Sequence, residues 1–283
     1  MFKLLGEDIA TRCGIIGYGV VGQAIGSGLV KNNVNAWVFD TKTQPQVDPV
    51  LVNKTKAIFV CVNTPALKGK YDVTNMNKVF ESLIMYGYKG LVILISTMGI
   101  NEYKQLKYKH KDAKFNVMVC PEFLTEKNAA SDFYNQTDVT YGPWINKAVD
   151  TTFQHALRAC KKTGVRFFRK TVEECLLIKT GKNLTLFLKL VAANLVYSEA
   201  QYHGLSAKAA QEVINEIYLD ERLESYKAYH TVGCHEGTLG VAGTCLPKDV
   251  EGKTHSTTIP ALNKVFTALT ELNIYFRSRK LTK

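Results

Sequence analysis

The sequence predicts an α/β fold, in which an N-terminal doubly wound parallel sheet is followed by an all-helical part. Two observations support this prediction. Residues 13–142 alternate short β-branched segments with amphipathic helical patterns, and strands that are joined by helices form parallel sheets. From residue 171 onward the periodicity is that of helices. We therefore expect one domain over residues 1–170 and a second domain over residues 171–283.

Six segments of the first domain have the composition of buried strands. The segment 57–62 lacks the alternation of a strand with one solvated face, which indicates a strand that is covered on both faces. The predicted strands are CGIIG (13–17), NAWVF (35–39), AIFVCV (57–62), LVILIS (91–96), FNVMV (115–119) and DVTYG (138–142).

The second domain begins with a long helical pattern from Thr171 to about His203. This pattern is apolar on nearly all sides, as is typical of a helix in the middle of a domain. Further helices are predicted at about 206–226 and 258–281. The segment from His230 to Lys248 contains four glycines, and we expect it to be a loop.

A glycine-rich turn directly follows the first strand and precedes an amphipathic helix from Val20 to Val30. In such a turn the first glycine allows the tight bend, the second lets a pyrophosphate approach the backbone, and the third lets the helix pack on the strand. The amides at the helix N-terminus then hold the phosphates. The turn reads Gly17-Tyr18-Gly19-Val20-Val21-Gly22.

Asp40 ends the next strand, 18 residues after Gly22. A carboxylate at this place accepts hydrogen bonds from both ribose hydroxyls and repels a 2′-phosphate. Lys42 slightly weakens that preference. The constellation predicts a Rossmann unit that binds NAD rather than NADP, and it makes a structural glycine turn without a ligand the lesser alternative.

The composition and charge are those of a basic globular protein. With 46% hydrophobic and 22% charged residues, the 283 residues suffice for two packed domains. The net charge of +11 indicates an anionic partner. Nucleic acid could bind the five lysines between residues 104 and 114, but such runs usually form a solvated helix face. We expect no nucleic acid, since a dinucleotide and a sugar nucleotide also suit a basic protein.

The cysteines and the apolar segments indicate a cytoplasmic protein. Seven cysteines lack metal-ligand spacing and cannot all pair, so we expect reduced thiols and no metal. Glu7 and Asp8 lie where a secretory signal needs an apolar core. The most apolar stretch, 184–196, is shorter than a membrane span and contains Lys189 and Asn194. We therefore expect neither export nor membrane insertion.

Cys245 is the candidate nucleophile. It lies in a glycine-lined segment, 240–249, just before Lys248 and Asp249. A nearby ammonium favours the thiolate, and flexible backbone lets a carbonyl carbon come within bonding distance. A lone cysteine is more often inert packing, but these neighbours favour a reactive thiol.

Lys179 and Asn183 lie four residues apart on the long helix, so their side chains share a face. The lysine could pair with a carboxylate across the core, or both groups could stabilise an oxygen that becomes negative. The sequence leaves these alternatives open. Glu122 and Glu126 follow a predicted strand, at the edge that faces ligands in open α/β sheets. Each could be a general base or a capping or solvent-facing acid.

Together these segments resemble the UDP-glucose/GDP-mannose dehydrogenase family, in order and spacing, over nearly the whole chain. The resemblance implies oxidation of the C6 alcohol of a nucleotide sugar to a carboxylate by two hydride transfers to NAD. UDP-glucose, giving UDP-glucuronate, is the expected substrate, and GDP-mannose is the alternative. The matching segments are the glycine turn 17–22, CVNTP at 61–65, Ser96-Thr97, PEFLTE at 121–126, Lys179 with Asn183, and GTCLPKD at 243–249.

The resemblance also assigns roles. Cys245 would form a thiohemiacetal and then a thioester, and Lys179 and Asn183 would stabilise oxygens. Asp249, Glu126 and Glu122 would handle water and protons. The implied cofactor-binding residues are Gly17, Gly19, Val20, Val21, Gly22, Asp40, Thr64, Pro65, Thr97 and Lys248. The implied substrate-binding residues are Phe123, Leu124, Lys179, Asn183 and Gly243. The long helices would form a central dimerisation domain in a homodimer.

Three departures from the family pattern bear on this assignment. Thr125 replaces an arginine that is common in the family. Met98-Gly99 follows Ser96-Thr97, where the family usually has valine followed by proline and glycine. Family members continue into a third domain that binds the nucleotide of the substrate, so we expect a short form without it. A truncated NAD-binding pseudoenzyme or regulatory subunit is therefore an alternative. A hydroxyacid dehydrogenase shares the lysine–asparagine pair, but it needs no nucleophilic cysteine.

Overall fold

The structure is a computed structural model that describes residues 13–43, 48–144, 149–223, 229–233, 237–255 and 257–279. The acidic residues Glu7 and Asp8, and also Cys234, lie outside the described residues. The chain divides into two compact units. The first unit contains Met1–Thr64 and Asp72–Lys179, and the second contains Pro65–Tyr71 and Thr180–Lys283. The expected boundary at residue 170 precedes the long helix, whereas this division falls inside the helix.

A seven-stranded sheet forms the centre of the first unit within the described residues, in the order β2-β1-β3-β6-β7-β8-β9. The pairs β1–β2, β1–β3, β3–β6 and β6–β7 are parallel. All six predicted strands are present. The Val-, Ile- and Phe-rich runs of β1, β3 and β6 are buried along their whole length, as expected of strands that are covered on both faces. The strands are β1 (Cys13–Ile16), β2 (Ala36–Phe39), β3 (Ala57–Val60), β6 (Leu91–Leu94), β7 (Asn116–Val119), β8 (Asp138–Pro143) and β9 (Arg166–Arg169).

Two strands differ from the prediction. β8 pairs antiparallel with β7, with Val119 opposite Gly142, so the sheet is mainly but not wholly parallel. β9 was not predicted, and it pairs parallel with β8. Its sequence, RFFR, has no fully buried residue, so it lacks the apolar run by which the other strands are recognised. An ion pair between Arg166 and Asp138 joins β9 to β8.

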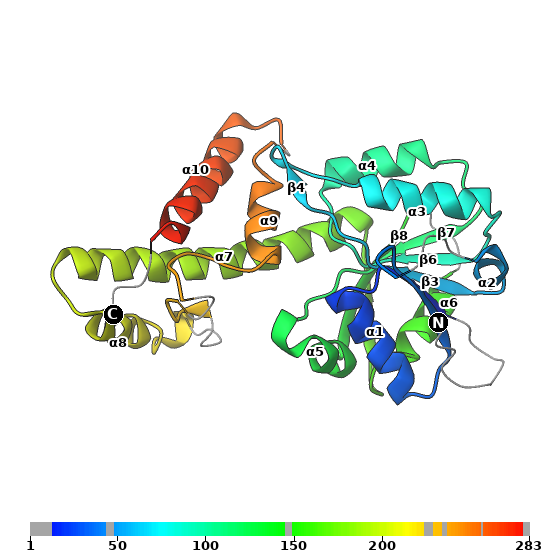
Figure 1. Cartoon of the computed structure of the whole chain (residues 1–283), viewed down its shortest axis with the longest axis horizontal. Helices are drawn as coiled ribbons and strands as arrows, with labels where there is room; N and C mark the ends of the chain where they lie inside the picture. Colours follow the sequence, from blue (N-terminus) through cyan, green and yellow to red (C-terminus); the bar gives the residue numbers. More distant parts are fainter. Residues whose placement is uncertain are drawn as a thin grey trace. The chain divides into compact units, whose positions relative to one another are not determined.

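Helices cover both faces of this sheet, as expected of a doubly wound fold (Figure 1). One apolar cluster joins Ile15, Phe59 and Ile93 of the sheet to α1, α5 and α6. The other joins alternate strand residues, such as Ile58 and Val92, to α3 and α4. The helices are α1 (Val20–Lys31), α2 (Pro49–Asn53), α3 (Thr74–Met85), α4 (Ile100–Lys109), α5 (Ala129–Asn135) and α6 (Asp150–Arg158), with the short 3₁₀ helix η1 (Glu126–Asn128).

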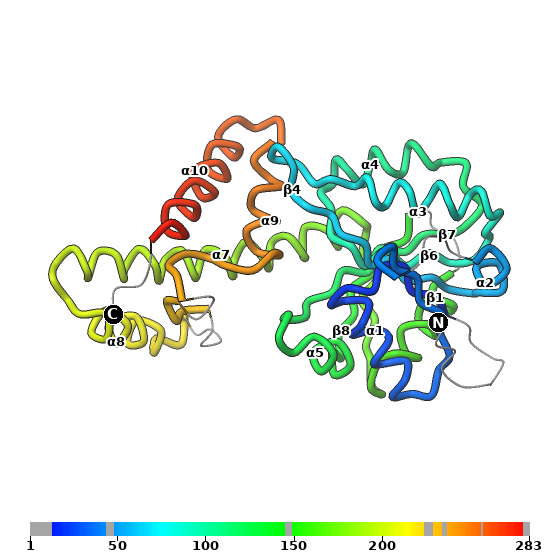
Figure 2. The backbone as a smooth tube through the Cα atoms, in the orientation of Figure 1, coloured from blue at the N-terminus to red at the C-terminus, as the bar shows by residue number. Residues whose placement is uncertain are grey.

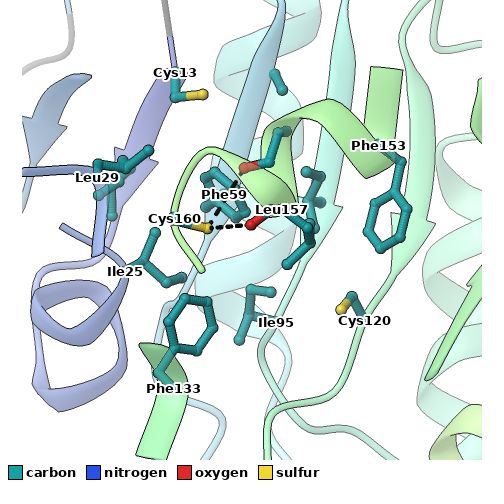
Figure 3. Close-up of a cluster of buried hydrophobic side chains, with 14 of the residues drawn as sticks. Cys13, Ile25, Leu29, Phe59, Ile95, Cys120, Phe133, Phe153, Leu157 and Cys160 are labelled. Carbon is teal, nitrogen blue, oxygen red and sulfur yellow. Dashed lines mark hydrogen bonds between the residues drawn. The ribbon is translucent and has the colours of Figure 1, made fainter. Parts of the chain in front are cut away.

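Several cysteines are structural members of the first of these clusters. Cys13, Cys120 and Cys160 all belong to this cluster, in which Cys160 lies near Phe59 and Leu157 (Figure 3). The Cys160 thiol donates to the carbonyl oxygen of Leu157 at 3.3 Å. Burial raises the pKa of Cys13 and of Cys120 to about 12, so these thiols stay protonated and inert. No group of His, Cys, Asp or Glu among the described residues could hold a metal ion.

The second unit consists of helices and one short hairpin. The predicted long helix is confirmed as α7 (Val172–Tyr202), whose first residues belong to the first unit. The backbone trace shows the hairpin of β4 (Ala66–Leu67) and β5 (Lys70–Tyr71) beside α9 (Figure 2), and the amide of His255 donates to the carbonyl of Gly69. The other helices are α8 (Ala207–Ile217), η2 (Glu221–Leu223), α9 (Cys245–Glu251) and α10 (Pro260–Arg277).

The prediction of a loop up to Lys248 is wrong at its C-terminal end, because α9 begins at Cys245. Gly243, with φ of +78°, ends the loop conformation just before the helix. Pro247 does not prevent helix formation, since proline is tolerated in the first turn, where its missing N–H would have no intrahelical partner. In the part of the chain that the structure describes, no helix combines the length and the apolar character needed to span a bilayer.

Candidate active site

The three glycines of the predicted turn meet three different environments. Gly17 has φ of +90°, and a Cβ there would lie 2.7 Å from the carbonyl oxygen of Cys61. A Cβ on Gly22 would lie 2.1 Å from the carbonyl oxygen of Gly17. A Cβ on Gly19 would meet nothing within 4 Å. The first and third glycines are therefore required by packing, whereas the second leaves open space beside the backbone.

The N-terminus of α1 lies beside that open space. Gly19 is the N-cap residue, and no side chain among the described residues caps the helix. Val20 is exposed, so the amides of the first turn and the positive end of the helix dipole are available to an anion. A pyrophosphate fits this arrangement.

Asp40 is fixed beside the same turn. One carboxylate oxygen, Oδ2, accepts the amide of Tyr18 at 2.7 Å, and Oδ1 accepts the amide of Lys42 at 2.9 Å. Each oxygen keeps a further lone pair, with which it could accept a ribose hydroxyl. The negative charge disfavours a 2′-phosphate at this place. The turn, the helix N-terminus and Asp40 together fit an NAD molecule.

Hydroxyl groups tie together the segments that follow β3 and β6. Thr64 is buried, and its hydroxyl donates to the carbonyl of Thr97 at 2.5 Å. The hydroxyl of Ser96 donates to the carbonyl of Val62 at 2.7 Å. Both segments leave the carboxyl edge of the sheet, where α/β proteins bind their ligands. Pro65, the next predicted cofactor residue, begins the hairpin segment of the second unit.

Lys179 and Glu122 form a buried ion pair in the first unit. Lys179 Nζ lies 3.2 Å from Glu122 Oε1, and the side chains are only 5% and 9% exposed. The other carboxylate oxygen accepts the amide of Leu124 at 2.8 Å, and Nζ lies 5.5 Å from the ring centre of Phe123. The sequence left open whether Lys179 pairs with a carboxylate or stabilises an oxygen that becomes negative. The structure contains the pairing with a carboxylate. This pair also gathers the predicted substrate residues Phe123 and Leu124.

Glu126 differs from Glu122 in its exposure to solvent. It begins η1 and is exposed to solvent. The preceding residue, Thr125, is held by Asp132, whose Oδ2 accepts both the amide and the hydroxyl of Thr125, at 2.8 and 2.6 Å. The sequence reading missed Asp132, which carries no motif and is recognised only from this contact.

In the second unit, Asp249 is the centre of a polar cluster. Asn183 Nδ2 donates to Asp249 Oδ2 at 2.5 Å, and Lys248 Nζ lies 2.9 Å from Oδ1. The Asp249 side chain is almost completely buried. Tyr71 donates its hydroxyl to the Asp249 carbonyl at 3.3 Å, and its ring centre lies 5.1 Å from Lys248 Nζ. The structure thus joins three predicted residues to one, Tyr71, that the sequence reading missed.

Cys245 is the first residue of α9 and is exposed, unlike Cys13, Cys120, Cys160 and Cys175, which are buried. Its Sγ lies 3.8 Å from the hydroxyl of Thr244. The preceding Gly243 is exposed, and a Cβ there would meet nothing within 4 Å. An accessible thiol at the start of a helix, four residues before a buried carboxylate, can act as a nucleophile toward a carbonyl carbon.

A cavity of about 700 Å³ lies elsewhere in the first unit, at the amino ends of β3 and β6. Its lining includes Asn53, Lys56, Tyr88 and Lys89. None of the predicted site residues lines it. The amino edge of such a sheet is opposite to the edge at which α/β proteins bind nucleotides, so we place the site at the glycine turn and not here.

Comparison with known proteins finds a matching family model for part of the chain and solved structures of similar fold. Residues 27–150 match the family model described as the NAD binding domain of the UDP-glucose/GDP-mannose dehydrogenase family. A UDP-glucose 6-dehydrogenase from Rickettsia bellii is 27% identical over 203 residues, which make up 70% of this chain and 44% of that protein. A solved UDP-glucose dehydrogenase from Pyrobaculum islandicum has a TM-score of 0.72 at 20% identity, covering 95% of this chain and 70% of that chain. The 3-hydroxyisobutyrate dehydrogenase of Mycobacterium tuberculosis has a TM-score of 0.66 at 13% identity, covering 96% and 97%.

The two structural likenesses show the fold alone, and the chain spans less than half of the length of the Rickettsia protein. The sequence match is more specific. It begins at Ser27 inside α1, so it does not include the glycine turn 17–22, but it includes Asp40, Thr64, Thr97 and Glu122. Residues 27–150 are therefore similar to the NAD-binding domain of the UDP-glucose/GDP-mannose dehydrogenase family.

Proposed function

We propose that the chain catalyses the NAD-dependent, four-electron oxidation of the C6 alcohol of a nucleotide sugar, with UDP-glucose as substrate and UDP-glucuronate as product. The observation that carries this proposal is the exposed Cys245 at the start of α9, next to the cluster of Lys248, Asp249 and Asn183. A single oxidation of an alcohol needs no thiol. Oxidation of an aldehyde needs a nucleophile that adds to it, because the carbonyl carbon must become tetrahedral before a second hydride can leave, and the Cys245 thiol would be that nucleophile.

The proposed oxidation consists of two hydride transfers followed by hydrolysis. When bound, NAD would be the hydride acceptor in each transfer. In the first step the C6 hydroxyl loses its proton and C6 loses a hydride, which leaves an aldehyde. The Cys245 thiol then adds to C6, a proton passes to the aldehyde oxygen, and a thiohemiacetal forms. This thiohemiacetal loses the second hydride from C6 and the proton of its hydroxyl group, and becomes a thioester. Water attacks the acyl carbon, the C–S bond breaks, and the carboxylate and the free thiol are released.

The polar residues that the family pattern singles out would stabilise charge and move protons in these steps. Lys179 and Asn183 would bind the oxygen of the alkoxide and of the thiohemiacetal, where a cation and an amide donor lower the free energy of negative charge. Asp249, Glu122 and Glu126 would accept protons from the hydroxyl and from the attacking water. Thr97 would lie near the reacting carbon, as in the family pattern.

The binding residues follow from the same proposal. The glycine turn with Val20 and Val21, Asp40, Thr64, Pro65, Thr97 and Lys248 would hold the cofactor. Phe123, Leu124 and Gly243 would contact the substrate. The carboxylate of Glu122 neutralises Lys179, so a substrate oxygen would have to share this ammonium with Glu122.

We also propose a homodimer that forms along α7. Leu188, Ala192 and Leu195 lie on one face of this helix at i, i+4 and i+7, and all three are exposed in the single chain. Leucines exposed by 42% and 48% on one stripe are typical of a helix that packs against a partner. Leu188→Lys should therefore convert the dimer to a monomer in sedimentation velocity, whereas Lys189→Glu should not. A wild-type monomer at micromolar concentration would contradict the proposal.

One assay tests the reaction. NADH formation is followed with limiting UDP-glucose, and with limiting GDP-mannose, for the wild type, Cys245→Ala and the buried-thiol control Cys175→Ala. The proposal expects two NADH per sugar for the wild type and for Cys175→Ala. Cys245→Ala should form no carboxylate, since without the thiol the aldehyde cannot become a thioester.

Other outcomes would contradict the proposal in specific ways. One NADH per molecule of a simple hydroxyacid, such as 3-hydroxyisobutyrate, would indicate a single-oxidation dehydrogenase. Measurable NAD binding without turnover of any sugar nucleotide would indicate a pseudoenzyme or regulatory subunit. Turnover with GDP-mannose but not with UDP-glucose would keep the reaction and change the substrate.

A further inference from the structure

The segment that leads into α9 is anchored in the core of the second unit. Val241 is fully buried and packs with Phe187 and Leu190 of α7 and with Val250 of α9. Gly240 has φ of +82°, and a Cβ there would lie 2.9 Å from the side-chain oxygen of Asn273. Main chain that is buried in this way must find hydrogen-bond partners inside the protein.

Two buried asparagines supply these partners. Asn194 of α7 accepts the amide of Gly240 on Oδ1 at 2.6 Å, and its Nδ2 donates to the carbonyl of Leu190. Asn273 of α10 accepts the amide of Val241 on Oδ1 at 2.7 Å and donates from Nδ2 to the carbonyl of the same residue at 3.1 Å. Burying an amide side chain costs free energy unless it is bonded. These two asparagines are bonded mainly to the segment before Cys245.

The segment that carries Cys245 is also held on the C-terminal side of the thiol. Asp249, four residues after Cys245, is bonded to Asn183 of α7. Asn183 and Asn194 lie eleven residues apart on α7, about 16 Å along the helix axis. Between the anchored Val241 and α9 there are only the residues 242–244, of which Gly243 and Thr244 are exposed. The position of the thiol is therefore set by two points of attachment to one helix.

We propose that Asn194 and Asn273 form an asparagine clamp that positions Cys245 for the second oxidation. This proposal rests on the proposed function. Both residues are positioning residues, since they bond the main chain at 240–241 and not the thiol. Only the second oxidation needs the thiol, so a displaced Cys245 slows that step and leaves the first step unchanged. A general loss of folding slows both steps together.

The experiment compares the wild type with Asn194→Ala, Asn273→Ala and the control Asn215→Ala. Asn215 is an exposed asparagine of α8 in the same unit, and its side-chain oxygen accepts a hydrogen bond from Gln211 at 3.0 Å. Hydrogen exchange of the peptide that contains Gly240 and Val241 measures the clamp directly. Loss of one buried hydrogen bond should raise its exchange rate on the order of tenfold, with no change in the glycine turn of the first unit.

Single-turnover NADH formation with UDP-glucose or GDP-mannose then separates the two oxidations into a first and a second phase. Each clamp variant should slow the second phase about 100-fold, the loss expected for a misplaced reacting group. The first phase and the affinity for NAD should stay within about twofold of the wild type. If Asn194→Ala does not fold, Asn273→Asp replaces the donor by a second acceptor oxygen that faces the Val241 carbonyl at a buried position, and it should slow the second phase at least as much as Asn273→Ala.

The possible outcomes distinguish a failure of the asparagine clamp from a failure of the proposed function. Unchanged exchange in both variants, or an equal slowing of both phases, overturns the clamp while the proposed function stands. If the wild type oxidises no sugar nucleotide, the proposed function fails, and the rate of Cys245 alkylation by iodoacetamide, quantified by mass spectrometry, decides the clamp. A change of threefold or more in that rate supports positioning, and an unchanged rate overturns it.

Discussion

Two alanine substitutions in the glycine turn should have opposite consequences. Gly22→Ala places a Cβ 2.1 Å from the carbonyl oxygen of Gly17, which is a backbone atom that cannot rotate away. Gly19→Ala places a Cβ in space where nothing lies within 4 Å, at a φ of −73° that alanine adopts without strain. We expect the first substitution to destabilise the fold and the second to weaken only the binding of NAD.

The magnitudes follow from these distances. Overpacking of this kind costs about 1–3 kcal/mol, and each kcal/mol lowers Tm by about 2–4 °C in a protein of this size class. Gly19→Ala should change the free energy of unfolding by less than about 1 kcal/mol, because the reduced freedom of the unfolded chain and the poorer N-cap oppose each other. The added methyl group would keep the pyrophosphate from the first-turn amides. Losing one hydrogen bond to a charged group costs about 1.5–3 kcal/mol, and Kd should rise about 10- to 100-fold.

Urea unfolding and calorimetric titration with NAD measure both quantities. Gly181→Ala is the matched control, because this glycine of α7 also has open space at its Cβ position but lies outside the turn. It should leave Kd unchanged. The reasoning would be refuted if Gly19→Ala bound NAD as tightly as the wild type, or if Gly22→Ala unfolded at the same urea concentration.

Three further predictions concern charged groups. Lys179→Met leaves the buried Glu122 without its partner, so urea unfolding should show a loss of about 3–5 kcal/mol in the free energy of unfolding. Adding Glu122→Leu should recover most of this loss. A double variant without recovery would contradict a simple pairing role. Burial, followed by the charge of Lys109, lowers the pKa of His110 below its ordinary 6.5. The folded protein therefore binds this proton less readily than the unfolded chain, and stability should fall as the pH drops below 6.5. His110→Gln should flatten the curve of unfolding free energy between about pH 7 and 5, and an unchanged slope would exclude His110 as the cause. Asp40→Ala should raise Kd for NAD about tenfold or more, and equal affinity would remove Asp40 from the ribose site.

The sequence by itself determined the elements whose signals are local. The glycine turn, the strand before it and Asp40 after the next strand are recognised from spacing alone, because backbone geometry over a few residues dictates where glycine is needed. The long helix α7 was predicted nearly to its ends, since its apolar pattern continues over 31 residues. Cys245, Lys179 and Asn183 stood out because reactive or charged groups in such surroundings need a reason.

Only the tertiary structure decided which groups meet. The partner of Lys179 is 57 residues away in sequence, and the partner of Asn194 is 46 residues away. In the sequence Asn194 was visible only as a polar interruption of an apolar stretch, and Asn273 and Tyr71 carried no signal. A buried polar group takes its partner from whatever main chain the packing of distant helices brings to it. Helical periodicity reports which face is buried, but it does not report what lies opposite that face. For this reason the partners of Asn194 and Asn273, and the identity of the carboxylate that pairs with Lys179, could not be predicted before the fold was known.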